Sequence, residues 1–269
     1  MPSWTCASEA FRNSAVSLFP NELPALDCHA HIAPDVTDSQ ISALNGAVVF
    51  SVSRTPAETD HALRRRDPTL VWGTGVHPAV PAALKDFSPH QFRTTLQRTC
   101  FIGEVGLDRR GSLELQRSVL TQIFAAARDE PVLLSLHSSG RTAALMDLLT
   151  SHPHPGIILH WFLGTPEERL HAISLGAYFS VNAAMPDETL AAFPLQRLLP
   201  ETDFPASRRA TGAARPGVVA PLEQRLAVLH GTTPQMIRRR FWQNLRELTT
   251  RTQVLDRLPE PIADWALEA

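Results

Sequence analysis

The stretch 25–31 reads Ala-Leu-Asp-Cys-His-Ala-His and ends a short apolar run with two histidines, His29 and His31. In a β-strand the side chains alternate between two faces, so these two rings point the same way and can bind one metal ion together. Two histidines at this spacing can equally be hydrogen-bonded core residues. The motif alone therefore leaves both interpretations open, and the rest of the chain has to decide between them.

Similar apolar runs recur along the chain, and most are followed by a helical pattern. We expect eight strands, at 25–31, 47–52, 70–76, 101–105, 132–137, 156–160, 177–181 and 195–203. Helices are expected among and after them, at 56–66, 89–98, 112–128, 141–150, 166–175, 187–192 and 234–249. Strands that alternate with helices indicate a parallel sheet with crossover helices. Eight such repeats predict an α/β fold, the (β/α)8 TIM barrel.

The length of 269 residues fits one barrel of this kind, so we expect a single domain over 25–269, preceded by an N-terminal arm over 1–24. The eighth strand is the least regular. Pro200 lies three residues before Asp203, and proline removes a hydrogen-bond donor from a central strand. We therefore expect this strand to be short or bulged. The following stretch, 207–220, is rich in Gly, Pro, Ala and Arg and is expected to be a loop.

Ionisable residues stand at the carboxyl ends of several predicted strands, where the loops of a (β/α)8 enzyme converge on the barrel axis and build its active site. Glu104 ends the fourth strand, His137 the fifth and His160 the sixth. Asp203 ends the eighth. Core histidines placed at random would not be distributed in this way. We therefore expect a metal site made of His29, His31, Glu104, His137, His160 and Asp203.

Imidazole and carboxylate ligands suit Zn, Mg or Mn rather than a metal selected by thiolates, and six ligands are enough for one or two divalent ions. Such ions generate hydroxide near neutral pH and stabilise the attacking and leaving oxygens. Glu104 and Asp203 are accordingly expected to be catalytic, in a hydrolase that uses metal-activated hydroxide. His77 follows the third strand at the same rim and is expected to contact the substrate or a group behind the metal ligands.

The net charge of −2 gives no overall basic surface, so contact with nucleic acid would have to rest on local arginines. Three arginine clusters occur, and those at 64–66 and 238–240 are interpreted as solvated helix faces. The third cluster, Arg208, Arg209 and Arg215, follows Asp203. No apolar stretch is long enough to span a membrane, and the three cysteines have irregular spacing typical of reduced thiols. We expect a cytoplasmic protein without a membrane partner.

At this point the sequence resembles the TatD-related metal-dependent DNases, a branch of the amidohydrolase barrels. The matching motifs are DCHAH at 27–31, GVHP at 75–78, GEVGLD at 103–108, LH at 136–137, HWFLG at 160–164 and ETD-x-P at 201–205, with Gln116 and the NLR of 244–246. The resemblance implies that His29 and His31 bind one metal, that Glu104 bridges, that His137 and His160 bind a second metal, and that Asp203 lies near the nucleophilic water. It also implies cleavage of phosphodiester bonds, often from a DNA end.

The substrate side departs from the family pattern. The family usually has Arg two positions after the fifth-strand histidine, where this chain has Ser139, and the nearest arginine is Arg141. Ser139 cannot bind an anion through charge, whereas Arg can hold a phosphate with two hydrogen bonds. Trp161 occupies the place of a customary small Cys, and arginines replace the usual signatures after Pro205. The residues expected to bind substrate are His77, Arg141, Arg208 and Arg209.

Three functions remain open. The first is a phosphodiesterase or deoxyribonuclease that acts on DNA or a nucleotide-like substrate. The second keeps the metals but hydrolyses another bond, an ester or amide such as that of D-aminoacyl-tRNA, because one fold hosts many chemistries. The third is a largely non-catalytic subunit of a defence complex, since the pattern also resembles TatD-like members of Qat anti-phage systems, with other defence-system proteins as partners. The intact ligand set argues against the third.

Overall fold

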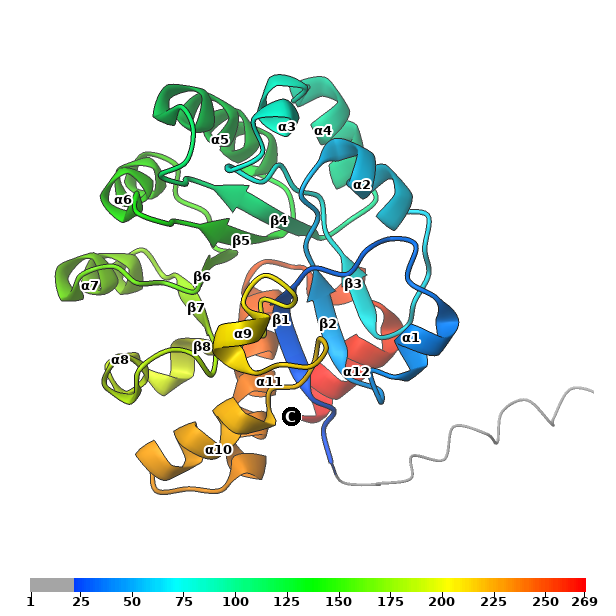
Figure 1. Cartoon of the computed structure of the whole chain (residues 1–269), viewed down its shortest axis with the longest axis vertical. Coiled ribbons are helices and arrows are strands. Elements are labelled where there is room, and N and C mark those ends of the chain that lie inside the picture. Colours follow the sequence, from blue (N-terminus) through cyan, green and yellow to red (C-terminus); the bar gives the residue numbers. More distant parts are fainter. Residues whose placement is uncertain (1–21) are drawn as a thin grey trace, which may run out of the picture.

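The computed structural model describes residues 22–269, and its strands and helices alternate as in a (β/α)8 barrel. Figure 1 shows the strands around a common centre with the helices outside them. The predicted arm at 1–24 lies, up to residue 21, outside the described residues. The strands are β1 (Leu26–Ala30), β2 (Val48–Ser51), β3 (Leu70–Trp72), β4 (Phe101–Gly106), β5 (Leu133–His137), β6 (Ile157–His160), β7 (Tyr178–Val181) and β8 (Leu198–Pro200).

Every strand pairing is parallel, in the order β1-β2-β3 and β4-β5-β6-β7-β8. Backbone hydrogen bonds join the two arrays at both seams. The Gly103 N–H donates to the Thr74 carbonyl at 2.9 Å, next to a bridge between Thr74 and Ile102. On the other side the Asp203 N–H donates to the His29 carbonyl at 2.9 Å. The sheet is therefore closed, and the predicted TIM-barrel fold is confirmed.

The helices form the outer layer of the barrel, and several begin at a residue that caps them. The Thr165 hydroxyl accepts a hydrogen bond from the Glu168 N–H, and the Glu168 carboxylate accepts one from the Thr165 N–H, with Pro166 in the first turn. The helices are α1 (Asp38–Ser42), α2 (Pro56–Ala62), α3 (Pro81–Lys85), α4 (Pro89–Leu96), α5 (Leu113–Ala127), α6 (Thr142–Ser151), α7 (Pro166–Ser174), α8 (Asp187–Ala191), α9 (Arg208–Thr211), α10 (Ala220–Leu229), α11 (Pro234–Arg251) and α12 (Glu260–Glu268). Among these described helices, none is long and apolar enough to cross a membrane.

Several expectations need correction. The stretch 207–220 is not all loop, because it contains the short helix α9. The helix predicted at 56–66 ends at Ala62. After it, the Arg65 guanidinium bonds the Asp67 carboxylate and the carbonyls of Pro34 and Val36, so this arginine is not simply solvated.

The end of the barrel near β8 is as irregular as Pro200 indicated. A 3-10 turn over Leu195–Arg197 precedes β8, which is three residues long, so the expectation of a short strand is correct. Asp203 consequently lies three residues beyond the strand rather than at its end. Glu104 also differs from the expectation, because it lies inside β4, where the pairing with β5 is irregular between Ile102 and Val105.

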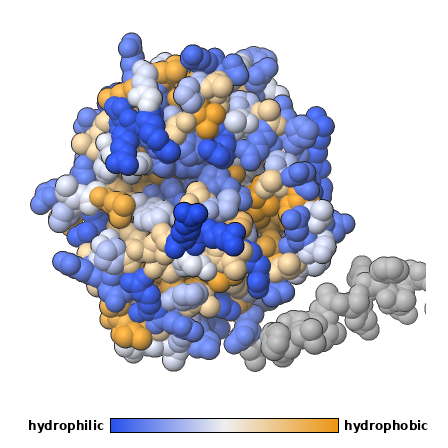
Figure 2. All heavy atoms as spheres, viewed as in Figure 1, coloured by the Kyte–Doolittle hydropathy of each residue, from blue (hydrophilic) through white to orange (hydrophobic). Residues whose placement is uncertain are grey.

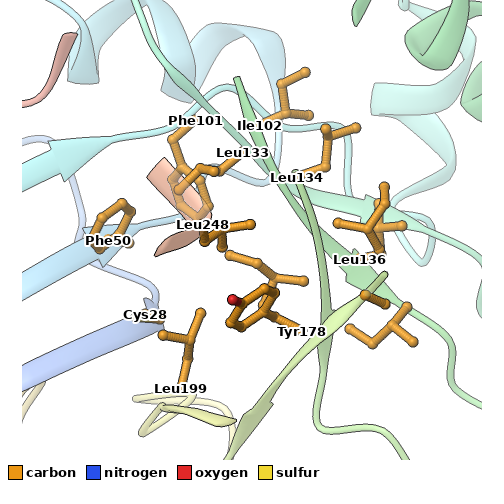
Figure 3. Close-up of a cluster of buried hydrophobic side chains, with 14 of the residues drawn as sticks. Cys28, Phe50, Phe101, Ile102, Leu133, Leu134, Leu136, Tyr178, Leu199 and Leu248 are labelled. Atoms are coloured by element: carbon orange, nitrogen blue, oxygen red, sulfur yellow. The ribbon is translucent and has the colours of Figure 1, made fainter. Parts of the chain in front are cut away.

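The core beneath the rim consists of fully buried apolar side chains from the strands and α11. Figure 3 shows Phe50, Phe101, Tyr178, Leu199 and their neighbours gathered in one cluster. The rings of Phe50 and Phe101 meet edge to face, with centroids 5.2 Å apart. Burial of each such side chain contributes about 1.5–3 kcal/mol, which makes this layer a rigid base for the polar residues above it.

Candidate metal centre

The six predicted ligand residues converge at the carboxyl end of the barrel. The rings of His29 and His160 stack with centroids 3.7 Å apart, and His137 Nδ1 lies 2.7 Å from Glu104 Oε1. Three groups have ligand atoms that all lie within 4.8 Å of one another: His29, His31 and Glu104; His29, His160 and Asp203; and His77, Glu104 and His137. The groups overlap at His29 and Glu104. His77, which we expected to bind substrate, lies among the ligand candidates.

Several ligand atoms in this cluster have no hydrogen-bond partner. Within the described part of the chain these buried atoms include His29 Nε2, His31 Nδ1 and Glu104 Oε2. Leaving a buried polar atom unsatisfied costs about 1–3 kcal/mol, and native proteins pair nearly all such atoms. The cluster combines imidazole nitrogens with carboxylate oxygens, which suits a divalent cation. The residues therefore fit a metal ion.

His29 is held so that one nitrogen is left for a ligand. Its Nδ1 lies 2.7 Å from the Ser135 hydroxyl oxygen, and its Nε2 lies 3.9 Å from both Glu104 Oε2 and Asp203 Oδ1. Burial, with the nearby charge of His160, holds the pKa of His29 well below its usual range. The ring stays neutral, and Ser135 orients it through the nitrogen that does not face the carboxylates.

His160 is oriented by a carboxylate for which we had predicted no role. Its Nδ1 lies 2.8 Å from Glu201 Oε2, and Glu201 also accepts from Asn182 Nδ2 at 2.9 Å and from the Ser180 hydroxyl. Burial opposes the charge on His160, but the Glu201 carboxylate raises its pKa to about 10. A carboxylate behind a histidine is typical of metal sites, where it fixes the ring and its tautomer.

His137 lies between two carboxylates. Besides the contact with Glu104, its Nε2 lies 2.8 Å from Asp108 Oδ2. Asp108 in turn accepts from the Arg110 backbone N–H at 2.7 Å and from the Arg110 guanidinium. Burial acts to raise the pKa of Asp108, but these hydrogen bonds hold it below its usual value. Asp108 belongs to the GLD motif and was also missed as a site residue.

Glu104 and His31 form the charged centre of the cluster. Burial alone would raise the pKa of Glu104, but the neighbouring rings of His137 and His31 hold it well below its usual range. His31 Nε2 lies 3.3 Å from Glu104 Oε2 and 3.6 Å from Asp203 Oδ1. Burial lowers the pKa of His31, yet the two carboxylates outweigh it and raise the pKa to about 9. The Glu104 carboxylate therefore stays ionised at the centre of the cluster.

Asp203 reaches the cluster through an unusual backbone conformation. Its φ is +47°, in the left-handed region that non-glycine residues seldom adopt. Such strain persists where the surrounding structure determines it, and it is common at functional sites. Here the Asp203 N–H is held by the His29 carbonyl, and the His31 N–H by the Phe204 carbonyl at 2.7 Å. The turn thus brings the Asp203 carboxylate to His29 and His31.

His77 contacts Glu104 directly. Its Nδ1 accepts a hydrogen bond from the Ala79 N–H at 3.0 Å, so in the neutral ring the proton is on Nε2, which lies 3.2 Å from Glu104 Oε2. Burial lowers the pKa of His77 to about 4. A neutral ring with an Nε2–H that faces the ligand cluster can donate to an anion there.

The predicted substrate-binding arginines lie in two environments. Arg141 donates from Nε to the Asp108 carbonyl at 3.1 Å and from Nη2 to the Gly111 carbonyl at 3.3 Å, so it holds the loop after β4. Arg208 and Arg209 are exposed on α9, and no described residue accepts a hydrogen bond from either side chain. Arg215 lies apart from them, in a hollow that it lines with Arg238.

Two further rim arginines were missed by the sequence reasoning. Arg54 lies between β2 and α2, and its backbone carbonyl accepts a hydrogen bond from the His77 N–H at 3.0 Å. Its positive charge acts to lower the pKa of His77. Arg109 is exposed and donates its backbone N–H to the Ser139 carbonyl at 2.8 Å. Their place directly after β2 and β4 was the signal that could have found them. Figure 2 shows strongly hydrophilic side chains over α9 and near α5 and α6, with a recess between.

A closed (β/α)8 barrel with clustered histidines and carboxylates at the carboxyl ends of its strands is typical of metal-dependent hydrolases. The particular family follows from comparison with known proteins. The model of the family "TatD related DNase" matches residues 26–250, so the chain belongs to that family. The resemblance to the TatD-related DNases is thereby confirmed.

Individual relatives support the same family. The chain is 29% identical over 187 residues to the 3'-5' ssDNA/RNA exonuclease TatD of Edwardsiella piscicida, covering 63% of this chain and 72% of that protein. It is 26% identical over 230 residues to the enzyme of the same name from Enterobacter lignolyticus, covering 77% and 88%. Among solved structures, the TatD homologue YJJV of Escherichia coli superposes with a TM-score of 0.72 at 22% identity, over 82% of this chain and 97% of that one. A TatD family hydrolase of Entamoeba histolytica gives 0.69 at 15% identity, over 84% and 98%, and both likenesses concern the fold.

Proposed function

We propose that this protein hydrolyses phosphodiester bonds in DNA, RNA or a nucleotide-like substrate, and that it uses one or two divalent metal ions to do so. The observation that carries the proposal is the cluster of unsatisfied ligand atoms on His29, His31 and Glu104 at the mouth of the barrel. The printed names of the bacterial relatives, which are 3'-5' ssDNA/RNA exonucleases, support a nucleic-acid substrate. The exposed arginines on the rim add positive charge where phosphates would approach.

In this proposal the overlapping ligand groups hold the metal. His29 and His31 would hold one ion with Glu104, and His160 with Asp203, and His137 with His77 and Glu104, would supply the remaining ligand atoms. A bound divalent ion, whether Zn, Mg or Mn, supplies Lewis-acid chemistry and lowers the pKa of water. The Asp203 carboxylate would accept the proton of the water that attacks phosphorus, and the proton would pass to the leaving nucleotide oxygen as its bond to phosphorus breaks. Glu201 and Asp108 keep the rings of His160 and His137 in position.

Phosphate recognition in this proposal belongs to Arg208, Arg209 and the Nε2–H of His77. Arg208 and Arg209 are exposed on the segment that follows Asp203, and a barrel commonly binds phosphate on loops at this end. Arg141 is less suited than we expected, because its guanidinium already bonds backbone carbonyls. Ser139 is exposed and carries no charge.

The direct test is hydrolysis by chelator-treated protein that is resupplied with Zn, Mg or Mn separately. Labelled single-stranded DNA and RNA should be shortened only when metal is present. Turnover of an aminoacyl ester without any cleavage of nucleic acid would favour the second function. Metal binding without turnover of any substrate would favour the non-catalytic role, and co-purification would then test for defence-system partners.

A variant pair tests the phosphate contacts. Arg208→Ala with Arg209→Ala should raise the Michaelis constant for an oligonucleotide and flatten its salt dependence, because fewer cations meet the phosphates. Metal binding should not change. Arg64→Ala with Arg93→Ala is the charge-matched control, since both residues are exposed on other faces. Equal effects from the two pairs would indicate bulk electrostatics and would contradict a specific contact.

We also propose residence in the cytoplasm. Cys28 and Cys100 are buried free thiols, which is typical of proteins in a reducing compartment.

A further inference from the structure

Trp161 borders a hollow beside the metal centre. It follows His160 directly, and the two ring centroids lie 6.5 Å apart. The hollow measures about 490 Å³ and is lined by Trp161 and the segment Pro205, Ala206, Ser207, Arg208, Arg209 and Ala210. The indole is partly buried, so one part of it packs on the core while the rest is open to this hollow. An aromatic surface and two arginines therefore share one depression next to the ligand cluster.

The core does not require an indole at this position. The next residue, Phe162, is the one that is fully buried, and it packs against Phe179 and Phe193 with centroids 5.5 and 6.5 Å away. Trp161 itself has a φ of +39°, which is an outlier for a bulky side chain. Its N–H donates to the Ser180 carbonyl at 3.1 Å, which ties the strained residue to β7. Strain of this kind at the edge of a site points to a functional use of the side chain.

The combination of groups selects the chemistry of a ligand. An indole face stacks on a planar base without regard to its hydrogen-bonding edge, and arginine binds phosphate through its planar fork. The guanidinium groups of Arg208 and Arg209 have no acceptor within residues 22–269. A nucleic-acid strand that enters the metal site would thus meet an aromatic surface for a base and cations for its phosphates on the same side. The His160 ring, whose centroid lies 6.5 Å from that of Trp161, stacks on His29 at 3.7 Å.

We propose that Trp161 stacks on the terminal base of the strand and thereby sets the preference of the site for the terminal nucleotide. The inference rests on the proposed function and adds to it a residue that determines specificity. A purine offers a larger face than a pyrimidine, and an abasic end offers none. The expected order of preference is therefore purine, then pyrimidine, then abasic end, and this order should depend on Trp161.

The test uses full-length metal-loaded protein and oligonucleotides that differ only in the terminal nucleotide. Trp161→Ala should raise the Michaelis constant for a purine end by about 5- to 150-fold, as expected for the loss of one base-aromatic stack. It should leave the abasic end nearly unaffected, so that the order of preference disappears. Trp161→Phe should restore much of the preference. An equal loss on all three ends, or no loss on any, would overturn the proposal.

A binding measurement separates this proposal from the proposed function. In chelator-treated protein, a phosphorothioate oligonucleotide should quench a part of the tryptophan fluorescence that is missing from Trp161→Phe. Trp265→Phe, which changes a partly buried tryptophan in a different hollow, is the matched control and should keep the quenching. If wild-type protein cleaves no phosphodiester but shows this quenching, the proposed catalysis fails while the stacking role stands. Quenching that is equal in the two variants would overturn the role of Trp161.

Discussion

Replacement of Glu201 by Gln should weaken metal binding without unfolding the barrel. Glu201 receives three hydrogen bonds, from His160 Nδ1 at 2.8 Å, from Asn182 Nδ2 at 2.9 Å and from the Ser180 hydroxyl. Because Nδ1–H is given to the carboxylate, Nε2 is the nitrogen of His160 that is left to bind a metal ion once its proton is displaced. The buried carboxylate thus determines which ring nitrogen can bind.

A glutamine cannot reproduce this arrangement in either orientation. If its amide nitrogen faces His160, it donates to Nδ1 and moves the ring proton to Nε2, which blocks the ligand atom. If its oxygen faces His160, the amide nitrogen meets the donating Nδ2 of Asn182. Asn182 cannot simply turn over, because its Oδ1 accepts from the Ala184 N–H at 3.0 Å. Either result disturbs His160.

The expected size of the effect follows from other metal sites. There the loss of a carboxylate that orients a metal-binding histidine typically lowers metal affinity or activity by about 10- to 100-fold. Metal affinity of Glu201→Gln should be measured by competition with a chelator, alongside thermal unfolding of the metal-free protein. Glu188→Gln on α8 removes the same charge from an exposed side chain and is the control. Unchanged affinity with a lowered melting temperature would refute the reasoning and make Glu201 a structural residue.

Three further predictions concern the cluster and one remote histidine. His29→Ala with His31→Ala should lower metal content in elemental analysis while the circular-dichroism spectrum stays nearly unchanged, and full metal retention would contradict the site. Glu104→Gln should lower turnover by orders of magnitude without a comparable loss of stability, and activity within a few-fold of wild type would contradict its role. Burial holds the pKa of His154 below its usual value, so the folded ring stays neutral while the unfolded chain takes up a proton below about pH 6.5. Stability is therefore lost as pH falls. His154→Asn should make the free energy of unfolding, measured with urea, depend less on pH between pH 7 and 5. An unchanged pH dependence would show that His154 does not contribute to it.

The strands and the ligand cluster could be predicted because both follow from short-range regularities. Alternation in a strand puts His29 and His31 on one face, and parallel strands bring Glu104, His137 and His160 to one rim. These rules need no knowledge of which strands are neighbours. The sequence therefore contains enough information to group the six residues at one rim of the barrel.

The partners of these residues could not be predicted in the same way. Glu201 reaches His160 from 41 positions away, and Asp108 reaches His137 from 29. Such contacts depend on strand order and on rotamers, which no local pattern contains. The hydrogen-bond partners of Arg141 could not be predicted for the same reason, since its bonds to backbone carbonyls depend on how the loop after β4 folds.

Asp27 on β1 links the strand that contains His29 to the segment 202–217, which contains Arg208 and Arg209. This buried carboxylate precedes His29 by two residues, and it accepts from the Thr202 hydroxyl at 2.6 Å, the Thr202 N–H at 3.0 Å and the Gly217 N–H at 2.8 Å. Burial raises its pKa to about 6 against these hydrogen bonds. Gly217 has a φ of +80°, and a Cβ there would lie 2.5 Å from the Ala47 Cβ, so only glycine fits this approach.

One side chain on β1 therefore fixes the two ends of the segment that contains Asp203, α9 and both candidate phosphate-binding arginines. In the middle of that segment the Ser207 hydroxyl donates to the Thr202 and Asp203 carbonyls, whereas Arg208 and Arg209 lie on the surface. Substitutions of Arg208 and Arg209 can change what the rim binds without moving Asp203 away from His29 and His31. This separation explains physically how the chain keeps the ligand motifs of its family while the residues after Pro205 differ from the family pattern.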